Sequence, residues 1–321
     1  MNWHDRKARA AANKLAQQID ELYVKYSRML IALGAKHEVN DAIFSFKSVR
    51  AHSEVESILS DFRADLMALY TGGVNVAVGI SEMKSKSLLK AVGATGKLSD
   101  RMITPNSILH GERRSTRVWK LGEGLRGQIE RVLDAGIREG KGAGAITKDL
   151  KKYLDEPDRL YRRVRDNHGE LKLSRAAKDY HPGAGVYRSS HQNAMRLART
   201  SMNRAYHKAD HDRWSQMSFV VGIKVQRGSS YPCPLCDSMV GEYPKDFTFL
   251  GWHPNCLCVA TPILANTPLG EEQYATNRVE TPEPFNAWVR ENRERISQAA
   301  TRETMPWFIL ELSLIHISEP T

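Results

Sequence analysis

The sequence predicts a mainly α-helical protein with a small α+β module near its C-terminus, which contains a β-hairpin and a zinc-knuckle-like cluster of Cys and His. Three observations support this fold class. Apolar residues recur every three or four positions over much of the chain from residue 8 to residue 214, as on one face of a helix. The pattern then changes to a run of β-branched residues at 219–226. All four cysteines lie between Cys233 and Cys258.

Residues 1–110 are expected to form an N-terminal helical region. Its first helix spans 8–33, with apolar residues at alternating steps of three and four. A second helix ends at Gly72-Gly73, because glycine lowers helix stability, and a shorter helix follows. The apolar face of the first helix consists of Ala12, Leu15, Ile19, Leu22, Tyr26, Met29 and Leu33.

Residues 111–187 are expected to form a second helical region and a loop. Helices are predicted over 115–138 and 146–154, separated by the glycine-rich stretch 140–144. That stretch lacks the Gly-Lys-Ser/Thr ending of a phosphate-binding loop, and no strand precedes it, so it is interpreted as a turn between helices. From residue 166 to residue 187 the sequence is loop-like.

Residues 188–264 change from a helical to a strand-like pattern. A long helix is predicted over 189–214, and a strand follows at 219–226. The segment 259–264 is a candidate partner for that strand. The stretch between the two strands contains the cysteine cluster and few apolar residues, so only a small core is expected there.

Residues 265–311 are expected to contain a polar linker and a last helix over 285–296. The final ten residues, 312–321, match the translation of a transposase adapter used in sequencing libraries, and they are interpreted as a read-through artefact. On this interpretation the natural reading frame continues beyond about residue 311.

Length, charge and hydropathy narrow the classes of protein that fit. The chain has 321 residues, a net charge of +10 and a pI of about 9.4, a length that suits one large domain or two modest ones. The excess of basic residues favours an acidic partner such as nucleic acid. The alternative is that these residues simply face solvent. A transmembrane helix needs about 20 consecutive apolar residues. The sequence contains no such run and no signal-peptide core, so a cytoplasmic protein without a membrane partner is expected.

The cysteines and one histidine form a pattern typical of metal sites. Two pairs are each separated by two residues, Cys233 with Cys236 and His253 with Cys256, and Cys258 follows as a fifth candidate that could replace Cys256 or His253. A structural Zn²⁺ takes four such ligands from two tight turns. Since the surrounding core is expected to be small, the metal is expected to stabilise the module.

Other interpretations of the cluster are open at this point. A cluster folded without metal, a disulfide and a catalytic zinc ion each fit the residue types, although in a cytoplasmic chain clustered cysteines favour metal over disulfide. For a catalytic ion, Asp237, Glu242 and Asp246 are candidate acid or base groups. The sequence shows no nucleophile–base pair, no H-E-x-x-H motif and no phosphate loop. No catalytic residue is therefore assigned, and the chain is not expected to be an enzyme.

Five motifs follow one another in a fixed order between residues 198 and 258. They are a helix with Ala-Arg-Thr, a strand, a Cys-x-x-Cys pair, a glycine shortly before an aromatic residue, and a closing His-Pro-x-Cys-x-Cys. The residues that carry them are Ala198-Arg199-Thr200, the strand near Val221, Cys233 with Cys236, Gly241 with Tyr243, and His253 to Cys258. This order resembles the Mu F-like family of phage head-morphogenesis (minor capsid) proteins. Two positions depart from the family, because Ser201 and Leu257 stand where Glu and Arg are usual.

The chain also resembles a subgroup of that family from phages and prophages of Bacteroidales. The residues that carry this closer resemblance are Tyr187-Arg188-Ser189-Ser190, Arg204-Ala205-Tyr206, Trp252-His253-Pro254 and the helix 285–296. The resemblance implies a minor protein of the virion capsid, made in the bacterial host cytoplasm, which acts in head assembly, often near the portal, or in DNA packaging. It implies the portal protein and the major capsid protein as partners. DNA, bound without sequence specificity, is a further candidate partner because of the basic charge.

Two alternatives to head assembly are kept. One is the N-terminal part of a longer protein with a C-terminal effector domain, which some relatives in the resembled family carry. The other is a nucleic-acid-binding zinc module, because basic residues flank the cluster, although they form an imperfect stripe on the long helix. These basic residues are Arg196, Arg199, Arg204, Lys208, Arg213, Lys224, Arg227 and Lys245.

Overall fold

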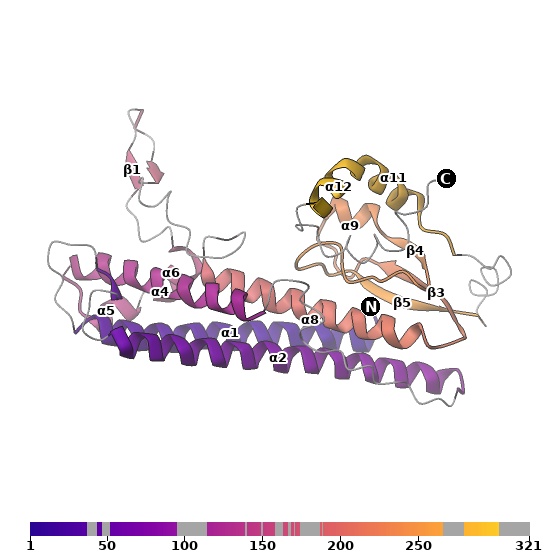
Figure 1. Cartoon of the computed structure of the whole chain (residues 1–321), viewed down its shortest axis with the longest axis horizontal. Helices are drawn as coiled ribbons and strands as arrows, with labels where there is room; N and C mark the ends of the chain where they lie inside the picture. The colour runs from indigo at the N-terminus through magenta and orange to yellow at the C-terminus, as the bar shows by residue number, and fades with distance from the viewer. Residues whose placement is uncertain are drawn as a thin grey trace. The chain divides into compact units, whose positions relative to one another are not determined.

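The computed structural model describes residues 1–36, 44–46, 52–94, 114–138, 140–148, 150–157, 163–165, 168–169, 171–173, 187, 189–265 and 279–301. The tail 312–321, most of the linker before residue 279 and much of the loop 166–187 lie outside these ranges. Within them the protein is mainly helical, with a small antiparallel sheet toward the C-terminus (Figure 1). A Cys/His cluster lies in the same region, and together these features confirm the predicted fold class. No helix in the described ranges is long and apolar enough to cross a membrane.

The chain divides into two compact units, and each collects segments that are far apart in the sequence. The helical unit contains Asn13–Gly72 and Gly111–Arg199, and the cysteine unit contains Met1–Ala12, Gly73–His110 and Thr200–Thr321. Three long helices contribute residues to both units, namely α1 (Trp3–Gly34), α2 (His52–Ala91) and α8 (Ser190–Trp214).

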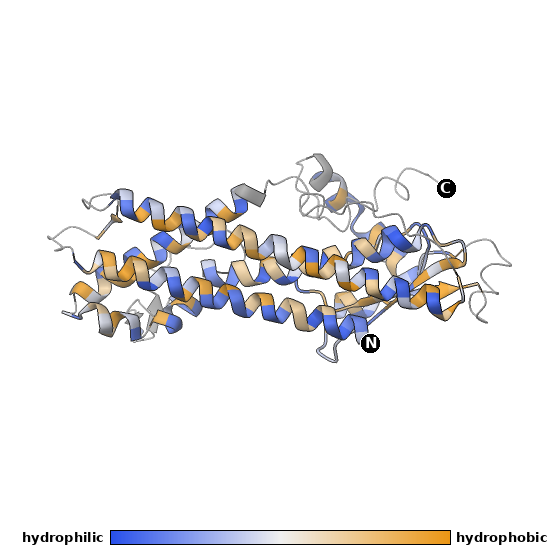
Figure 2. Cartoon of the chain, turned by 90° about the horizontal axis from the view of Figure 1, so that it is seen from below, coloured by the Kyte–Doolittle hydropathy of each residue, from blue (hydrophilic) through white to orange (hydrophobic). Residues whose placement is uncertain are grey.

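The helical unit packs parts of these three helices with α4 (Arg114–Arg138), which confirms the predicted helix over 115–138. The Tyr23 hydroxyl of α1 donates to the Ser190 carbonyl at 3.2 Å, and the Tyr70 hydroxyl of α2 donates to the Ala194 carbonyl at 2.9 Å. Both helices are thereby fixed against α8. Apolar and polar residues alternate along each helix, as Figure 2 shows, because only one face of each is buried.

The buried face of α1 departs from the predicted face toward the end of the helix. Leu15 and Ile19 are buried as predicted, but Met29 is 41% exposed, and Leu30 and Ile31 are buried instead. An α-helix has 3.6 residues per turn, so its packed face drifts away from a strict alternation of three and four. The predicted stripe is therefore wrong by one or two positions in the last turns.

The prediction that Gly72-Gly73 ends the second helix is wrong, because α2 continues to Ala91 and includes the stretch predicted as a separate short helix. The residues after the glycine pair keep the helical spacing of buried positions, and Val74, Ala77 and Ile80 are at most 3% exposed. Burial of this face outweighs the roughly 1 kcal/mol that a glycine costs in a helix interior.

The glycine-rich stretch near residue 140 is a turn between helices, as predicted, and Gly140 adopts a left-handed φ of +69° there. It leads into α5 (Ala143–Lys148) and α6 (Leu150–Asp155). Farther on, β1 (Arg163–Arg165) pairs antiparallel with β2 (Leu171–Leu173) inside the region expected to be helices and loop. Three residues are too few for a periodic strand pattern, so the sequence does not reveal this ribbon.

A three-stranded antiparallel sheet with the order β4-β3-β5 forms the centre of the cysteine unit. The predicted strand is β3 (Val220–Gln226), and it pairs with the predicted partner, β5 (Val259–Leu264). The third strand, β4 (Gly241–Pro244), is not predicted, because it has only four residues and its two ends are Gly and Pro, which strands disfavour.

An aromatic core packs in the cysteine unit, so the expectation of a small core is wrong. Five rings lie with centroids 4.2 to 6.2 Å apart along the packed pairs, and each of the five residues is at most 4% exposed. They are Tyr243, Phe247, Phe249, Trp252 and Phe285. The last of these comes from the C-terminal helical segment, which local sequence around the cysteines does not include.

That C-terminal segment forms two helices, α11 (Glu283–Glu291) and α12 (Arg293–Thr301), in place of the single predicted helix. The break falls at Asn292, whose side-chain amide donates to the Trp288 carbonyl at 2.9 Å. Asparagine forms such local bonds readily, and they interrupt the helical pattern.

A buried polar network joins α1, α2 and α8 within the cysteine unit. The Lys84 ammonium donates to the carboxylates of Asp5 and Asp210 at 3.1 and 2.7 Å, and the Tyr206 hydroxyl donates to Asp5 at 2.7 Å. Burial opposes the ionisation of Asp5, but its contacts with Lys84 and Tyr206 lower its pKa. Because a buried charge without its partner is strongly destabilising, the network fixes how the three helices are aligned.

Replacing Gly72 by alanine tests the continuity of α2. Gly72 is exposed, and a Cβ placed there meets no atom within 4 Å. We expect Gly72→Ala to raise the free energy of unfolding by about 0.5–1 kcal/mol in urea denaturation, because alanine loses less backbone entropy in a helix. Gly34→Ala is the contrasting variant, since its Cβ would lie 2.4 Å from Leu133 Cδ1 and should destabilise. A loss of stability in Gly72→Ala would mean that the helix is interrupted at this glycine.

Candidate metal centre

The first half of the Cys/His cluster is a tight turn that leads from β3 into the short helix α9 (Pro234–Ser238). Cys233 is the N-cap of α9, and Pro234 occupies the first helical position, where its missing N–H costs nothing. The Asp237 N–H closes the turn by donating to the Cys233 carbonyl at 2.8 Å. Arg227 also holds this carbonyl, through a hydrogen bond of 3.1 Å. The turn therefore presents two thiols three residues apart.

The second half is a turn that precedes β5. The Cys256 N–H donates to the His253 carbonyl at 3.0 Å, and Asn255 adopts a left-handed φ of +61°, which asparagine tolerates better than most residues. Gly251 has a φ of +95°, and a Cβ there would lie 3.1 Å from Cys256 Cβ. The glycine therefore leaves the space that the Cys256 side chain needs.

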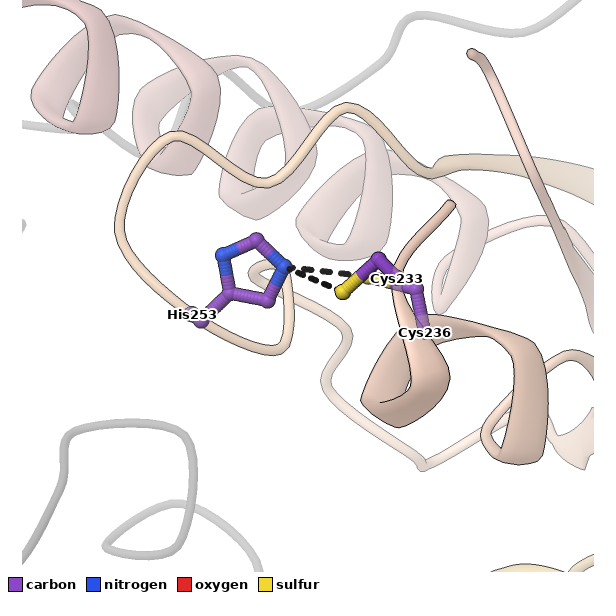
Figure 3. Close-up of side chains that lie close together, drawn as sticks. All are labelled: Cys233, Cys236 and His253. Atoms are coloured by element: carbon purple, nitrogen blue, oxygen red, sulfur yellow. Dashed lines mark hydrogen bonds between the residues drawn. The ribbon is translucent and has the colours of Figure 1, made fainter. Parts of the chain in front are cut away.

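The two turns bring their ligand atoms together. His253 Nε2 lies 3.3 Å from Cys233 Sγ and 3.1 Å from Cys236 Sγ (Figure 3), and Cys236 Sγ lies 3.8 Å from Cys256 Sγ. Two overlapping groups each have all their ligand atoms within 4.8 Å, one with Cys233, Cys236 and His253, and one with Cys236, Cys256 and Cys258. All four cysteines are free of disulfides. The cluster could hold a metal ion, and Cys236 belongs to both groups.

The orientation of His253 suits a ligand. Its Nδ1 lies 2.8 Å from the Pro254 carbonyl oxygen. Because a carbonyl can only accept, Nδ1 carries the proton, and the lone pair of Nε2 faces the thiols of Cys233 and Cys236. A second hydrogen bond of this kind is the usual way in which proteins orient a metal-binding imidazole.

Hydrogen bonding distinguishes Cys256 from Cys258. Bonds from the thiols of Cys236 and Cys258 hold the pKa of Cys256 well below its usual range, and the backbone N–H groups of Trp252 and Cys258 add to this effect while burial opposes it. The same thiol contacts with Cys256 raise the pKa of Cys236 and of Cys258. Hydrogen bonding therefore favours ionisation at Cys256 over its two neighbours.

The carboxylates considered as catalytic groups are not among the candidate metal ligands, although Asp237 accepts a hydrogen bond from the Cys233 N–H at 3.4 Å. Asp237 pairs with Arg227 at 3.2 Å, and Glu242 pairs with Lys224 at 3.2 Å. Asp246 is exposed. Among the described residues, none of the three carboxylates belongs to a group that could hold a metal.

Several basic residues that flank the cluster in sequence are buried or paired. Arg204 and Arg213 are at most 6% exposed. Lys208, Lys224 and Arg227 each contact a carboxylate. The long helix therefore offers fewer accessible cations to a phosphate backbone than its sequence indicates.

Thr200 has a structural role that the sequence does not reveal. It belongs to the Ala-Arg-Thr motif, and its Oγ1 accepts a hydrogen bond from the Asn255 N–H at 3.2 Å. The bond fixes the second turn of the cluster to α8. The two residues are 55 positions apart, so no local pattern predicts their contact.

The fold and the site together define a mainly helical protein with a candidate Cys/His metal centre beside a small antiparallel sheet. No family model, curated protein or solved structure matches the chain.

Replacing Thr200 tests its support of the second turn. Valine has nearly the same shape but cannot accept the Asn255 N–H, so we expect Thr200→Val to lower the free energy of unfolding by about 1 kcal/mol. Urea denaturation measures the change. Thr200→Ser keeps the acceptor and is the control, and equal stability of the two variants would contradict the role.

Proposed function

We propose that this chain is a structural protein of the phage head, of the Mu F-like class, whose Cys/His cluster holds one Zn²⁺. The supporting observation is that motif residues spread over the sequence meet at one site. Thr200 bonds to the backbone of Asn255, which lies between His253 and Cys256. The Tyr243 ring lies 5.8 Å from the Trp252 ring, in the core that also contains three of the cysteines. A shared site formed by the motif residues is what the proposed family relationship would produce.

The donor types, and the spacing of the atoms around Cys236, suit a structural zinc ion. A tetrahedron with Zn–S of about 2.3 Å and Zn–N of about 2.0–2.1 Å separates its ligand atoms by roughly 3.5–3.8 Å. The corresponding separations around Cys236 are 3.1 Å to His253 and 3.8 Å to Cys256. Cys233, Cys236, His253 and Cys256 would hold the ion, and Cys258 would stay outside this set of four. When bound, zinc supplies a cross-link between the two turns, and four protein ligands leave no open position for a substrate.

The aromatic core limits how much of the module depends on the metal. Tyr243, Phe247 and Trp252 are buried whether or not the thiols bind an ion, since their packing partners are other rings. The metal-free protein should therefore keep its sheet and lose order at the two turns, in contrast to small zinc modules that unfold completely without metal.

The long helices and the cross-linked module are suited to a role in head assembly. Helices of 32, 40 and 25 residues offer extended surfaces for protein contacts, and a cross-linked module resists mechanical and thermal stress. In this proposal the chain is a minor component of the capsid that contacts the portal and the major capsid protein. DNA is a secondary partner, bound through its phosphates.

The zinc site can be tested by metal analysis of purified protein prepared without chelator. We expect close to one Zn²⁺ per chain, and loss of the metal in Cys233→Ser, Cys236→Ser, His253→Ala and Cys256→Ser. Cys258→Ser is the matched control, and it should retain zinc because Cys258 is not one of the four proposed ligands. Loss in Cys258→Ser with retention in Cys256→Ser would exchange the two roles. A wild-type protein without zinc would refute the site.

The assembly role can be tested with the portal protein encoded by the same phage or prophage. Co-expression followed by affinity purification should recover both proteins without DNA, because the proposed contact is between proteins. The Cys233→Ser variant shows whether the contact needs an intact cluster. Failure of the wild type to copurify, together with its absence from purified virions and proheads, would refute the assembly role while leaving the zinc site untouched.

A further inference from the structure

The backbone carbonyls that follow Cys256 accept hydrogen bonds from three side chains, each on a different helix. We name them the carbonyl clamp, and all three belong to the cysteine unit, as do their acceptors. Their contacts are Arg9 of α1 to Leu257 at 3.2 Å, His207 of α8 to Cys258 at 3.3 Å, and Lys84 of α2 to Ala260 at 3.1 Å. None of the three is a candidate metal ligand, and two of the three helices begin far from the cysteines in sequence.

Arg9 acts on the peptide group that lies between the two alternative fourth ligands. The Leu257 carbonyl and the Cys258 N–H belong to one planar peptide unit, in which they point in opposite directions. Arg9 holds the carbonyl, so the Cys258 N–H points to the opposite side. This contact therefore fixes the orientation of the peptide that links Cys256 to Cys258.

The same guanidinium nitrogen also joins the two turns. Arg9 Nη2 donates to the Gly228 carbonyl at 2.7 Å as well as to Leu257. The backbones are in close contact here, because a Cβ at Gly228 would lie 2.0 Å from the Leu257 oxygen. Gly228 precedes Cys233 in the chain segment that leads into the first turn. One cation from α1 thus connects the segments that carry both halves of the cluster.

The position of Arg9 is itself set by buried contacts. Asp5, one turn earlier on α1, is 3% exposed and bonds to Lys84 and Tyr206. Because this pairing fixes the first turns of α1, Arg9 reaches the two carbonyls without losing further backbone freedom. By contrast Arg6, on the same helix, is exposed.

We propose that Arg9 is a positioning residue of the metal centre, which orients the Leu257–Cys258 peptide and so fixes which of Cys256 and Cys258 is presented to the ion. The inference rests on the zinc site proposed above. It makes the first three turns of α1 part of the metal centre, although they lie more than 220 residues before the first cysteine. Residues that orient a ligand through a hydrogen bond typically change metal affinity 10- to 100-fold when they are replaced.

The test compares zinc release from full-length wild type, Arg9→Met, Arg9→Lys and Arg6→Met, with a chelating indicator dye in excess. We expect release from Arg9→Met to be at least about tenfold faster than from wild type. Arg9→Lys keeps a cationic donor and should recover most of the loss, and Arg6→Met should match wild type. Urea denaturation of each protein with and without zinc separates positioning from general stabilisation. A positioning residue lowers the stability of the zinc form more than that of the metal-free form.

Cobalt substitution identifies the ligand. In a protein with Arg9 intact, Cys258→Ser should leave the Co²⁺ thiolate and d–d absorption bands unchanged. In the Arg9→Met background the same substitution should alter them, because Cys258 then competes with Cys256. Purified wild-type protein that contains no zinc would refute both the proposed site and this inference. Stoichiometric zinc, with equal release from Arg9→Met and Arg6→Met, would overturn the inference alone. If Arg9→Met does not fold, the rates of zinc release from Arg9→Lys and Arg9→Gln are compared with wild type instead. Rates equal to wild type in both variants overturn the inference.

Discussion

The cysteine unit depends on the pairing of two strands, because that pairing delivers both halves of the cluster to the same place. β3 and β5 are neighbours, and Gln226 at the end of β3 lies opposite Val259 at the start of β5. The chain that leaves β3 carries Cys233 and Cys236, and the chain that enters β5 carries His253 and the remaining cysteines. Antiparallel pairing thus places two segments distant in sequence at one end of the sheet. A shift of register would separate the thiols and remove the site.

The environment of the cluster explains why neighbouring groups matter as much as the ligands. Cys236, Cys256 and Cys258 are at most 3% exposed. Water cannot orient them, so their geometry comes from the N–H groups, carbonyls and side chains that surround them. Thr200 and Arg9 act on the backbone on either side of Cys256. Each does so from a long helix, which moves little compared with a loop.

The buried charges of the cysteine unit also depend on partners from several helices and strands. Lys84 bonds to two carboxylates and to the Ala260 carbonyl of β5. Removing such groups from water is costly, and the cost is offset only when every partner is in place. A helix arrangement that displaced Asp5 or Asp210 would leave a buried charge unpaired. The polar network therefore selects one alignment of α1, α2 and α8 against the sheet, which hydrophobic burial alone would not distinguish.

By itself, the sequence determined what local chemistry dictates. Ligand type and spacing indicated Cys233, Cys236, His253, Cys256 and Cys258 as a possible metal cluster, and β-branched runs indicated the strands that became β3 and β5. Tertiary structure decided whatever depends on distant residues. Packing carried α2 through Gly72-Gly73, Phe285 completed an aromatic core whose other four rings lie in the cysteine segment, and Arg9 reached Leu257 across most of the chain. The reason is physical, since propensities and turn geometry act within a few residues, whereas burial and long-range hydrogen bonds exist only once the chain has folded.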